Sequence, residues 1–348
     1  MSQMSIRHLS QEDINFLSEV YYDKRKIQQI VERIKAESNR RNLFKVNAII
    51  EQERILSDSI TVPKSLAFLY QKKIEALCFL NFIENYETIT ALSESLKELK
   101  DRFPHDADIN AIYWISESIF YNRATKNLES SSPLFIRLEF SQIANSAEDN
   151  FEKKLINDVN ECSKNLELHL YQIEEKELQA EILYTLGINM LISPITRLQA
   201  DSYFNRSGKI YDEIDNLTGK ISSVIMEGLS SALAGSYLNS AKHFQVAEQF
   251  IENRNALYKC PLLKAFLLVS KMEALYYFFK NPKILSNVDK PINQNDILVV
   301  IQNIYKESKD VLDCFNTTFE KDTDYCWWLL ENQKRMEFIK QDILENKS

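Results

Sequence analysis

The chain has 348 residues, of which 45% are hydrophobic and 26% are charged, so it can bury a large core. It contains only 5 glycines and 7 prolines, whereas β-rich and doubly wound α/β folds need glycine for hairpin turns and phosphate-binding loops. A net charge of −8 argues against the basic surface of a nucleic-acid-binding domain. Composition therefore predicts an all-α protein without direct nucleic-acid binding.

The cysteines and the apolar segments indicate the compartment. Five cysteines are an odd number, with no CxxC pair and no histidine at metal-ligand spacing, which is typical of reduced thiols. No window reaches the roughly 18 apolar residues of a membrane span, and the N-terminus lacks the apolar stretch of a secretory signal. We expect a cytoplasmic protein that does not enter a membrane. The cysteines are Cys78, Cys162, Cys260, Cys314 and Cys326.

Helical periodicity organises the first third of the chain. Residues 1–60 are expected to form an N-terminal helical region, and a repeat domain is expected over 61–348. Pro63 starts the first hairpin of that domain, and Pro104 closes it. The helices expected here cover residues 10–38, 43–58, 64–85, 86–103 and 108–121.

The rest of the sequence predicts further helices that are separated by polar segments. Residues 122–132 are the most polar interior stretch and predict an exposed loop. The last helix has one apolar and one charged side, which suits a terminal capping helix. Trp327 and Trp328 lie in it, and whether either indole is exposed stays open. The helices expected here cover residues 146–191 with an interruption near Glu174, 261–280, 296–315 and 324–346.

An internal echo is the most informative pattern. Two glycines lie 41 residues apart, a period within the range of stacked helical pairs. Each is followed thirteen residues later by alanine, at an interval that a hairpin would use where its helices approach closely. The first copy is Gly187, Ala200, Phe204 and Ser207, and the second is Gly228, Ala241, Phe244 and Ala247.

The first copy, whose glycine ends the run Leu183-Tyr-Thr-Leu-Gly187, resembles the tetratricopeptide pattern. That pattern has a Leu-Gly pair and small residues on two antiparallel helices. The second copy is similar but lacks the leucine before Gly228. The resemblance implies a right-handed stack of antiparallel helical hairpins, a tetratricopeptide-like (TPR-like) α-solenoid. Length and layout are also distantly similar to bacterial Rap and arbitrium-receptor peptide sensors, although no diagnostic motif is shared.

Motifs for chemistry are absent from the sequence. The four histidines are scattered without an HExxH pattern, and five glycines form no P-loop, GxGxxG or GxSxG motif. Asp101, Asp106 and Asp108 could hold a divalent ion, but their position between two helices favours a solvated turn. The sequence therefore predicts no catalytic residue, no cofactor and no metal site.

We interpret the chain as a non-enzymatic scaffold or regulator that binds a protein or peptide in the inner groove of the stack. The alternative left open is a helical metal-dependent hydrolase or lyase with an unrecognised acidic site. Homodimerisation also stays open. In the tetratricopeptide class, the first helix of each hairpin lines the groove. The positions that carry over are Glu181, Tyr184, Ile188, Ser222, Ile225 and Leu229.

Overall fold

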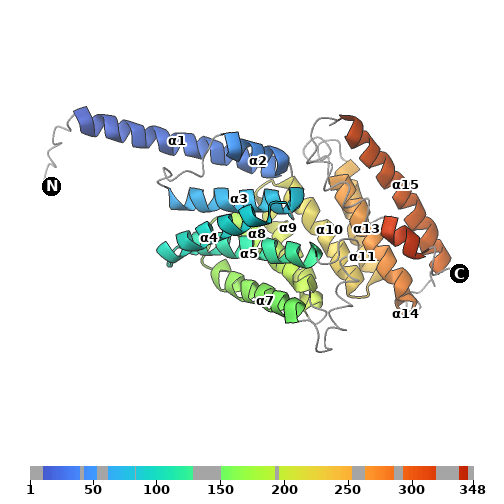
Figure 1. Cartoon of the computed structure of the whole chain (residues 1–348). Coiled ribbons are helices and arrows are strands. Elements are labelled where there is room, and N and C mark those ends of the chain that lie inside the picture. The colour runs from blue at the N-terminus through green and yellow to red at the C-terminus, as the bar shows by residue number, and fades with distance from the viewer. Residues whose placement is uncertain are drawn as a thin grey trace.

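The computed structural model describes residues 11–39, 43–52, 62–82, 84–127, 150–192, 196–252, 263–285, 293–318 and 337–343. Within these ranges the chain forms α-helices joined by turns and contains no strand, which confirms the all-α prediction (Figure 1). None of the helices in these ranges is both long and apolar enough to cross a membrane.

The helices of the first third follow the sequence signals closely. Pro63 opens α3 at its first position, where proline lacks only an amide that would be unpaired anyway. The predicted loop at 122–132 is wrong at its start, because α5 continues to Asn127, while residues 128–132 lie outside the described residues. Asn122 and Arg123 are buried there, so their polarity reflects internal partners rather than exposure. The elements are α1 (Gln11–Asn39), α2 (Leu43–Gln52), α3 (Pro63–Asn81), α4 (Tyr86–Arg102) and α5 (Ala107–Asn127).

The later helices include the interruption expected near Glu174, which lies between α7 and α8. Residues 337–343 of the predicted capping helix are helical, and Ile339 and Ile343 are buried in the core. Trp327 and Trp328 lie outside the described residues. The elements are α7 (Asn150–Leu170), α8 (Lys176–Ile192), α9 (Arg197–Glu213), α10 (Leu217–Leu233), α11 (Tyr237–Glu252), α13 (Leu263–Lys280), α14 (Pro282–Leu285) and α15 (Gln294–Thr318).

Successive helices pack in pairs that follow one another along the molecule (Figure 1). Within pairs, α3 packs on α4, α5 on α7, α8 on α9 and α10 on α11. Between pairs, α4 packs on α5, α7 on α8, α9 on α10 and α11 on α13. The first helices also touch one another, α3 with α5, α5 with α8 and α10 with α13. This arrangement is that of a helical repeat.

The two echo glycines lie where paired helices touch. A Cβ atom built on Gly187 would lie 2.5 Å from the Phe204 ring, and one on Gly228 would lie 2.9 Å from the Phe244 ring. Both distances are shorter than a carbon–carbon contact of about 3.5 Å. Each glycine therefore admits the aromatic ring of the following helix against its backbone.

One part of the echo is wrong. Ala241 is exposed. Ala200, which is buried, lies four residues before Phe204, and the residue four before Phe244 is Ser240, which is 2% exposed. The cause is the connection between α10 and α11, which is one residue shorter than that between α8 and α9. The second helix of the repeat thus shifts by one position against the alanine alignment.

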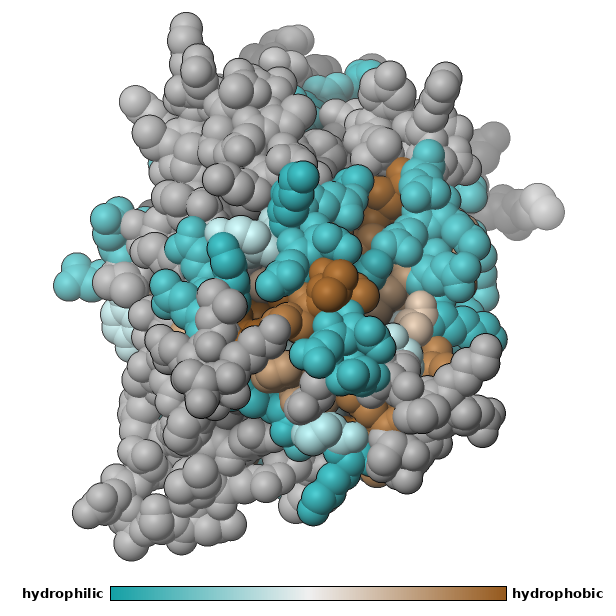
Figure 2. Space-filling model, turned by 90° about the vertical axis from the view of Figure 1, so that its right-hand side faces the viewer, coloured by the Kyte–Doolittle hydropathy of each residue, from teal (hydrophilic) through white to brown (hydrophobic). Residues whose placement is uncertain are grey.

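The C-terminal side of the molecule exposes apolar surface between hydrophilic side chains (Figure 2). On α15, Val299 and Val300 are 54% and 42% exposed, and Leu238 on α11 is 59% exposed. The described helices therefore leave apolar area uncovered in this half of the stack.

Substitution of Gly187 by alanine tests the close approach. In an unconstrained helix, Gly→Ala stabilises by about 1 kcal/mol. Here the new methyl group meets the fully buried Phe204 ring, so Gly187→Ala should destabilise the fold by about 1–3 kcal/mol in urea titrations. In a Phe204→Leu background the cost should shrink, since the ring is gone. If Gly187→Ala stabilised the fold in both wild type and the Phe204→Leu background, the close contact between Gly187 and Phe204 would be contradicted.

Candidate functional site

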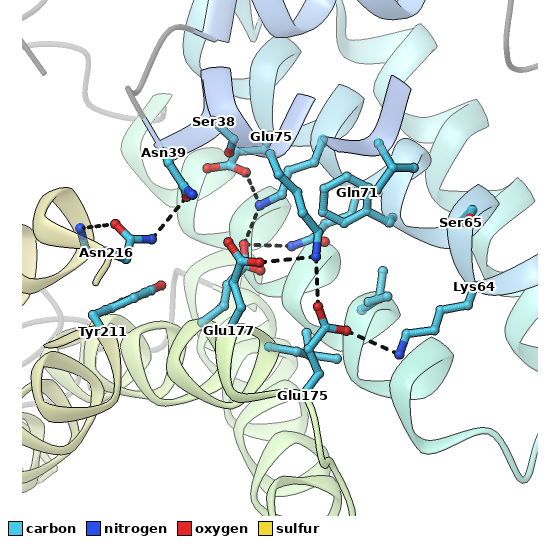
Figure 3. A pocket seen from close by; sticks show the side chains of 18 of the residues that line it. Ser38, Asn39, Lys64, Ser65, Gln71, Glu75, Glu175, Glu177, Tyr211 and Asn216 are labelled. Carbon is cyan, nitrogen blue, oxygen red and sulfur yellow. Dashed lines mark hydrogen bonds and ion pairs between the residues drawn. The ribbon is translucent and has the colours of Figure 1, made fainter. Parts of the chain in front are cut away.

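A cavity of about 220 Å³ lies where the N-terminal helices meet the repeat helices. Its walls come from α1, α3, α5, the start of α8, the end of α9 and the start of α10 (Figure 3). The first helices α3, α5, α8 and α10 thus face α1 across it. Its apolar wall includes Val31, Val62, Phe68, Ile112 and Leu178.

The deep part of the cavity holds a buried cation between two carboxylates. The Lys72 Nζ atom lies 2.6 Å from Glu181 Oε1 and 3.0 Å from Glu75 Oε2. Burial disfavours the charged amine, but Glu181 and Glu75 outweigh it and raise the pKa of Lys72. Burial also raises the pKa of Glu181, and Glu75 adds to the effect. Four glutamates and three lysines line the cavity as a whole, so carboxylates outnumber amines there.

Gln71 adds an unpaired acceptor to this region. Its Nε2 atom donates to Glu181 Oε1 over 2.9 Å, and that bond fixes the orientation of the amide. The other end, Oε1, is buried and has no hydrogen-bond partner, although Gln71 lines the cavity and is 0% exposed. An unpaired buried carbonyl costs about 1–3 kcal/mol, so a donor that reached this oxygen, once the side chain turned toward the cavity, would remove that cost.

The cavity mouth carries an ion-pair chain between α1, α3 and the start of α8 (Figure 3). Lys35 Nζ lies 2.9 Å from Glu175 Oε1 and 3.2 Å from Glu177 Oε2, and Lys64 Nζ lies 3.2 Å from Glu175 Oε2. Lys64 also pairs with Asp108. Burial opposes ionisation of Glu175, but Lys35 and Lys64 prevail and lower the pKa of its carboxyl. The chain holds α1 against the repeat helices.

The C-terminal end of α1 is joined to α10 as well. Asn216 Nδ2 donates to Asn39 Oδ1 over 3.1 Å, while Asn216 Oδ1 accepts from the Gly219 backbone amide over 2.9 Å. Asn216 thus caps α10 and contacts α1 with the two ends of one amide. The position of α1 and the cavity wall are therefore coupled.

The predicted groove residues divide into two groups. Glu181 lines the cavity. Tyr184 and Ile188 lie three and seven residues further along α8, on the same helix face, and are partly exposed. The Tyr184 ring packs edge-on against Phe204, with ring centroids 5.6 Å apart. A partner role for these three residues stays a prediction.

The other group is inside the core. Ser222, Ile225 and Leu229 on α10 are 1%, 0% and 2% exposed. Since α13 packs against α10, the apolar stripe that carries them contacts other helices, and a partner cannot touch them in this structure. An apolar stripe in the sequence does not distinguish an open groove from a covered one.

The acidic turn after α4 does not assemble a ligand set. Asp106 Oδ1 accepts from the Ile109 amide over 3.0 Å and caps α5. Asp108 pairs with Lys64, and Asp101 is exposed beside Lys100. Each of the three carboxylates therefore has a separate partner.

Sequence reasoning missed Gln71 and Lys72 at the cavity. Their only signal is a polar Gln-Lys-Lys run inside the otherwise apolar helix α3, where residues 71–78 are all buried. Such a run on a buried helix indicates internal polar partners. Comparison with known proteins adds no further guide, because no family model and no curated protein match this chain.

Removal of the Glu175 charge tests the ion-pair chain at the mouth. Because its pKa is lowered in the folded state, the carboxylate stabilises the fold above the unfolded value, about 4.3, and this contribution is lost as pH falls through the folded pKa. Glu175→Gln should lower the free energy of unfolding by at most about 1 kcal/mol near neutrality, since the group is 36% exposed.

That difference from wild type should shrink as the pH falls below about 4.3. Glu174→Gln is the matched control, because Glu174 is exposed and does not line the cavity. Chemical denaturation across pH would contradict the chain of ion pairs if the Glu175→Gln difference did not vary with pH.

Proposed function

We propose that the chain is a tetratricopeptide-like, right-handed stack of helical hairpins that binds a peptide or a protein segment in the cavity between α1 and the first helices. Support for the stack comes from the order of helix packing and from the repeated glycine–phenylalanine contact. We assign it a regulatory role without catalysis, as in the peptide sensors that the sequence distantly resembles.

The observation that carries this proposal is the unpaired Gln71 Oε1 atom beside an excess of carboxylates. A ligand that satisfies this group must bring an N–H donor, and the charge around Lys72 favours a donor that is itself cationic. A lysine or arginine side chain, or a free peptide N-terminus, has this chemistry.

The apolar wall complements the charged end. Phe68 lies between the amines of Lys35 and Lys72, each 5.7 Å from its ring centroid, while Ile112 and Leu178 also line the cavity. An apolar side chain next to the cationic group would bury area against this wall. The preferred ligand is therefore a segment with a basic group and an adjacent apolar residue.

Selection from a random-peptide library displayed with free N-termini tests the proposal. We expect the enriched peptides to combine a basic group with an apolar neighbour. Gln71→Leu should weaken their binding by about ten- to a hundredfold in calorimetry, because it removes a hydrogen bond to a charged group.

Gln199→Leu is the matched control, because Gln199 is exposed on α9 and does not line the cavity. Equal binding by wild type and Gln71→Leu would contradict the site, and so would a failure to enrich any peptide.

A further inference from the structure

A second cluster of chemically active side chains lies away from the cavity, between α9, α10 and α11. Asp201, Glu227 and His243 each supply one ligand atom, and these atoms all lie within 4.8 Å of one another. None of the three residues lines the cavity. The cluster is therefore independent of the peptide site proposed above.

The spacing of two of these atoms fits ligands of a single ion. His243 Nδ1 lies 3.3 Å from Glu227 Oε2. Two ligands of one tetrahedral zinc ion lie about 3.4 Å apart, since each is about 2.1 Å from the metal. The Asp201 carboxylate lies within 4.8 Å of both other ligand atoms, and its side chain is partly exposed.

Glu227 provides the second indication, because it is a buried carboxylate whose contacts within the described residues are one long hydrogen bond and one histidine. It is 5% exposed, and its Oε2 atom receives only a long hydrogen bond, 3.4 Å, from Asn205 Nδ2 besides the histidine contact. Its Oε1 atom has no hydrogen bond to any residue that the structure describes.

Direct charge compensation is weak as well, since Lys209 acts on Glu227 without forming an ion pair with it. In the described part of the chain, no lysine or arginine forms an ion pair with Asp201 or Glu227. Burial is the main cause that raises the pKa of Glu227 to about 7, and the neighbouring Asp201 adds to it. Buried carboxylates in proteins are normally paired or coordinate a metal.

We propose that Asp201, Glu227 and His243 bind one divalent transition-metal ion, with zinc as the reference ion. One imidazole nitrogen with two carboxylate oxygens suits zinc and similar ions, whereas calcium and magnesium prefer oxygen ligands alone. Three protein ligands leave a fourth position for water, and His243 is exposed enough to admit it.

The ion would connect the two hairpins of the echo. Asp201 comes from the second helix of the first hairpin, while Glu227 and His243 come from the two helices of the next. Ser231 Oγ lies 3.5 Å from Asp201 Oδ1 and would orient this ligand. Metal binding should therefore raise the melting temperature of the full chain.

Calorimetric titration of the metal-free full-length protein with zinc sulfate tests this inference. Wild type should bind one ion per chain at the cluster, and His243→Ala and Asp201→Asn should each weaken binding at least tenfold. His105→Ala and Asp212→Asn are matched controls, because both residues are exposed and outside the cluster, and they should bind as wild type does.

The cobalt form distinguishes this site from cysteine ligation. Cobalt(II) bound by nitrogen and oxygen should show visible d–d bands without the near-ultraviolet charge-transfer band of a thiolate. The thermal shift caused by zinc should vanish in His243→Ala while the metal-free melting temperature stays near that of wild type. A thiolate band, unchanged affinity in both cluster variants or no binding by wild type would overturn the proposal.

Discussion

The close approach of paired helices at two glycines is the contact on which the rest of the structure depends. Phe204 and Phe244 are buried, and each ring lies where a Cβ atom of Gly187 or Gly228 would otherwise be. The contact fixes α8 against α9 and α10 against α11. Because a dense core resists displacement, larger side chains at the two glycines would move whole helices rather than single atoms.

Both sites follow from that packing. α8 and the residue before it bring Glu177, Glu181 and Glu175 to the cavity, and the N-cap of α10 brings Asn216 to the end of α1. The proposed metal cluster needs the same two hairpins, since its three residues come from α9, α10 and α11. One repeat contact thus positions two groups of polar residues on different parts of the stack.

The cavity concentrates polar groups that a structural core would avoid. Lys72, Glu75 and Glu181 lose their contacts with water and interact with one another instead. Buried ion pairs of this kind seldom stabilise a fold more than apolar packing does. Gln71 keeps an unpaired oxygen beside them. Groups of this cost are expected where a ligand supplies the missing partner, and this is why the cavity rather than the apolar surface carries our functional assignment.

The sequence predicts the helices well and the sites poorly, for physical reasons. Helical periodicity and Pro63 are local signals, and they place α3 within a few residues of its observed bounds. The link between Lys35 and Glu175 spans 140 positions, and that between Gln71 and Glu181 spans 110, so only the packed fold brings these side chains together.

The same limit explains the buried groove positions. Ile225 and Leu229 have the apolar character of a binding surface, but a core face has it too, and the contact of α10 with α13 decides between them. The proposed metal cluster could not be predicted from the sequence either. His243 belongs to no local motif, and only the packing of three helices brings it close to Asp201 and Glu227.

Amide hydrogen exchange of the full chain, alone and saturated with a selected basic peptide, tests most directly whether the first helices form the binding surface. The account predicts slower exchange in the C-terminal half of α1, in α3 and in the first turn of α8. Exchange in α4, α7 and α11 should not change, because these helices do not line the cavity. Protection confined to α4, α7 or α11 would contradict the account.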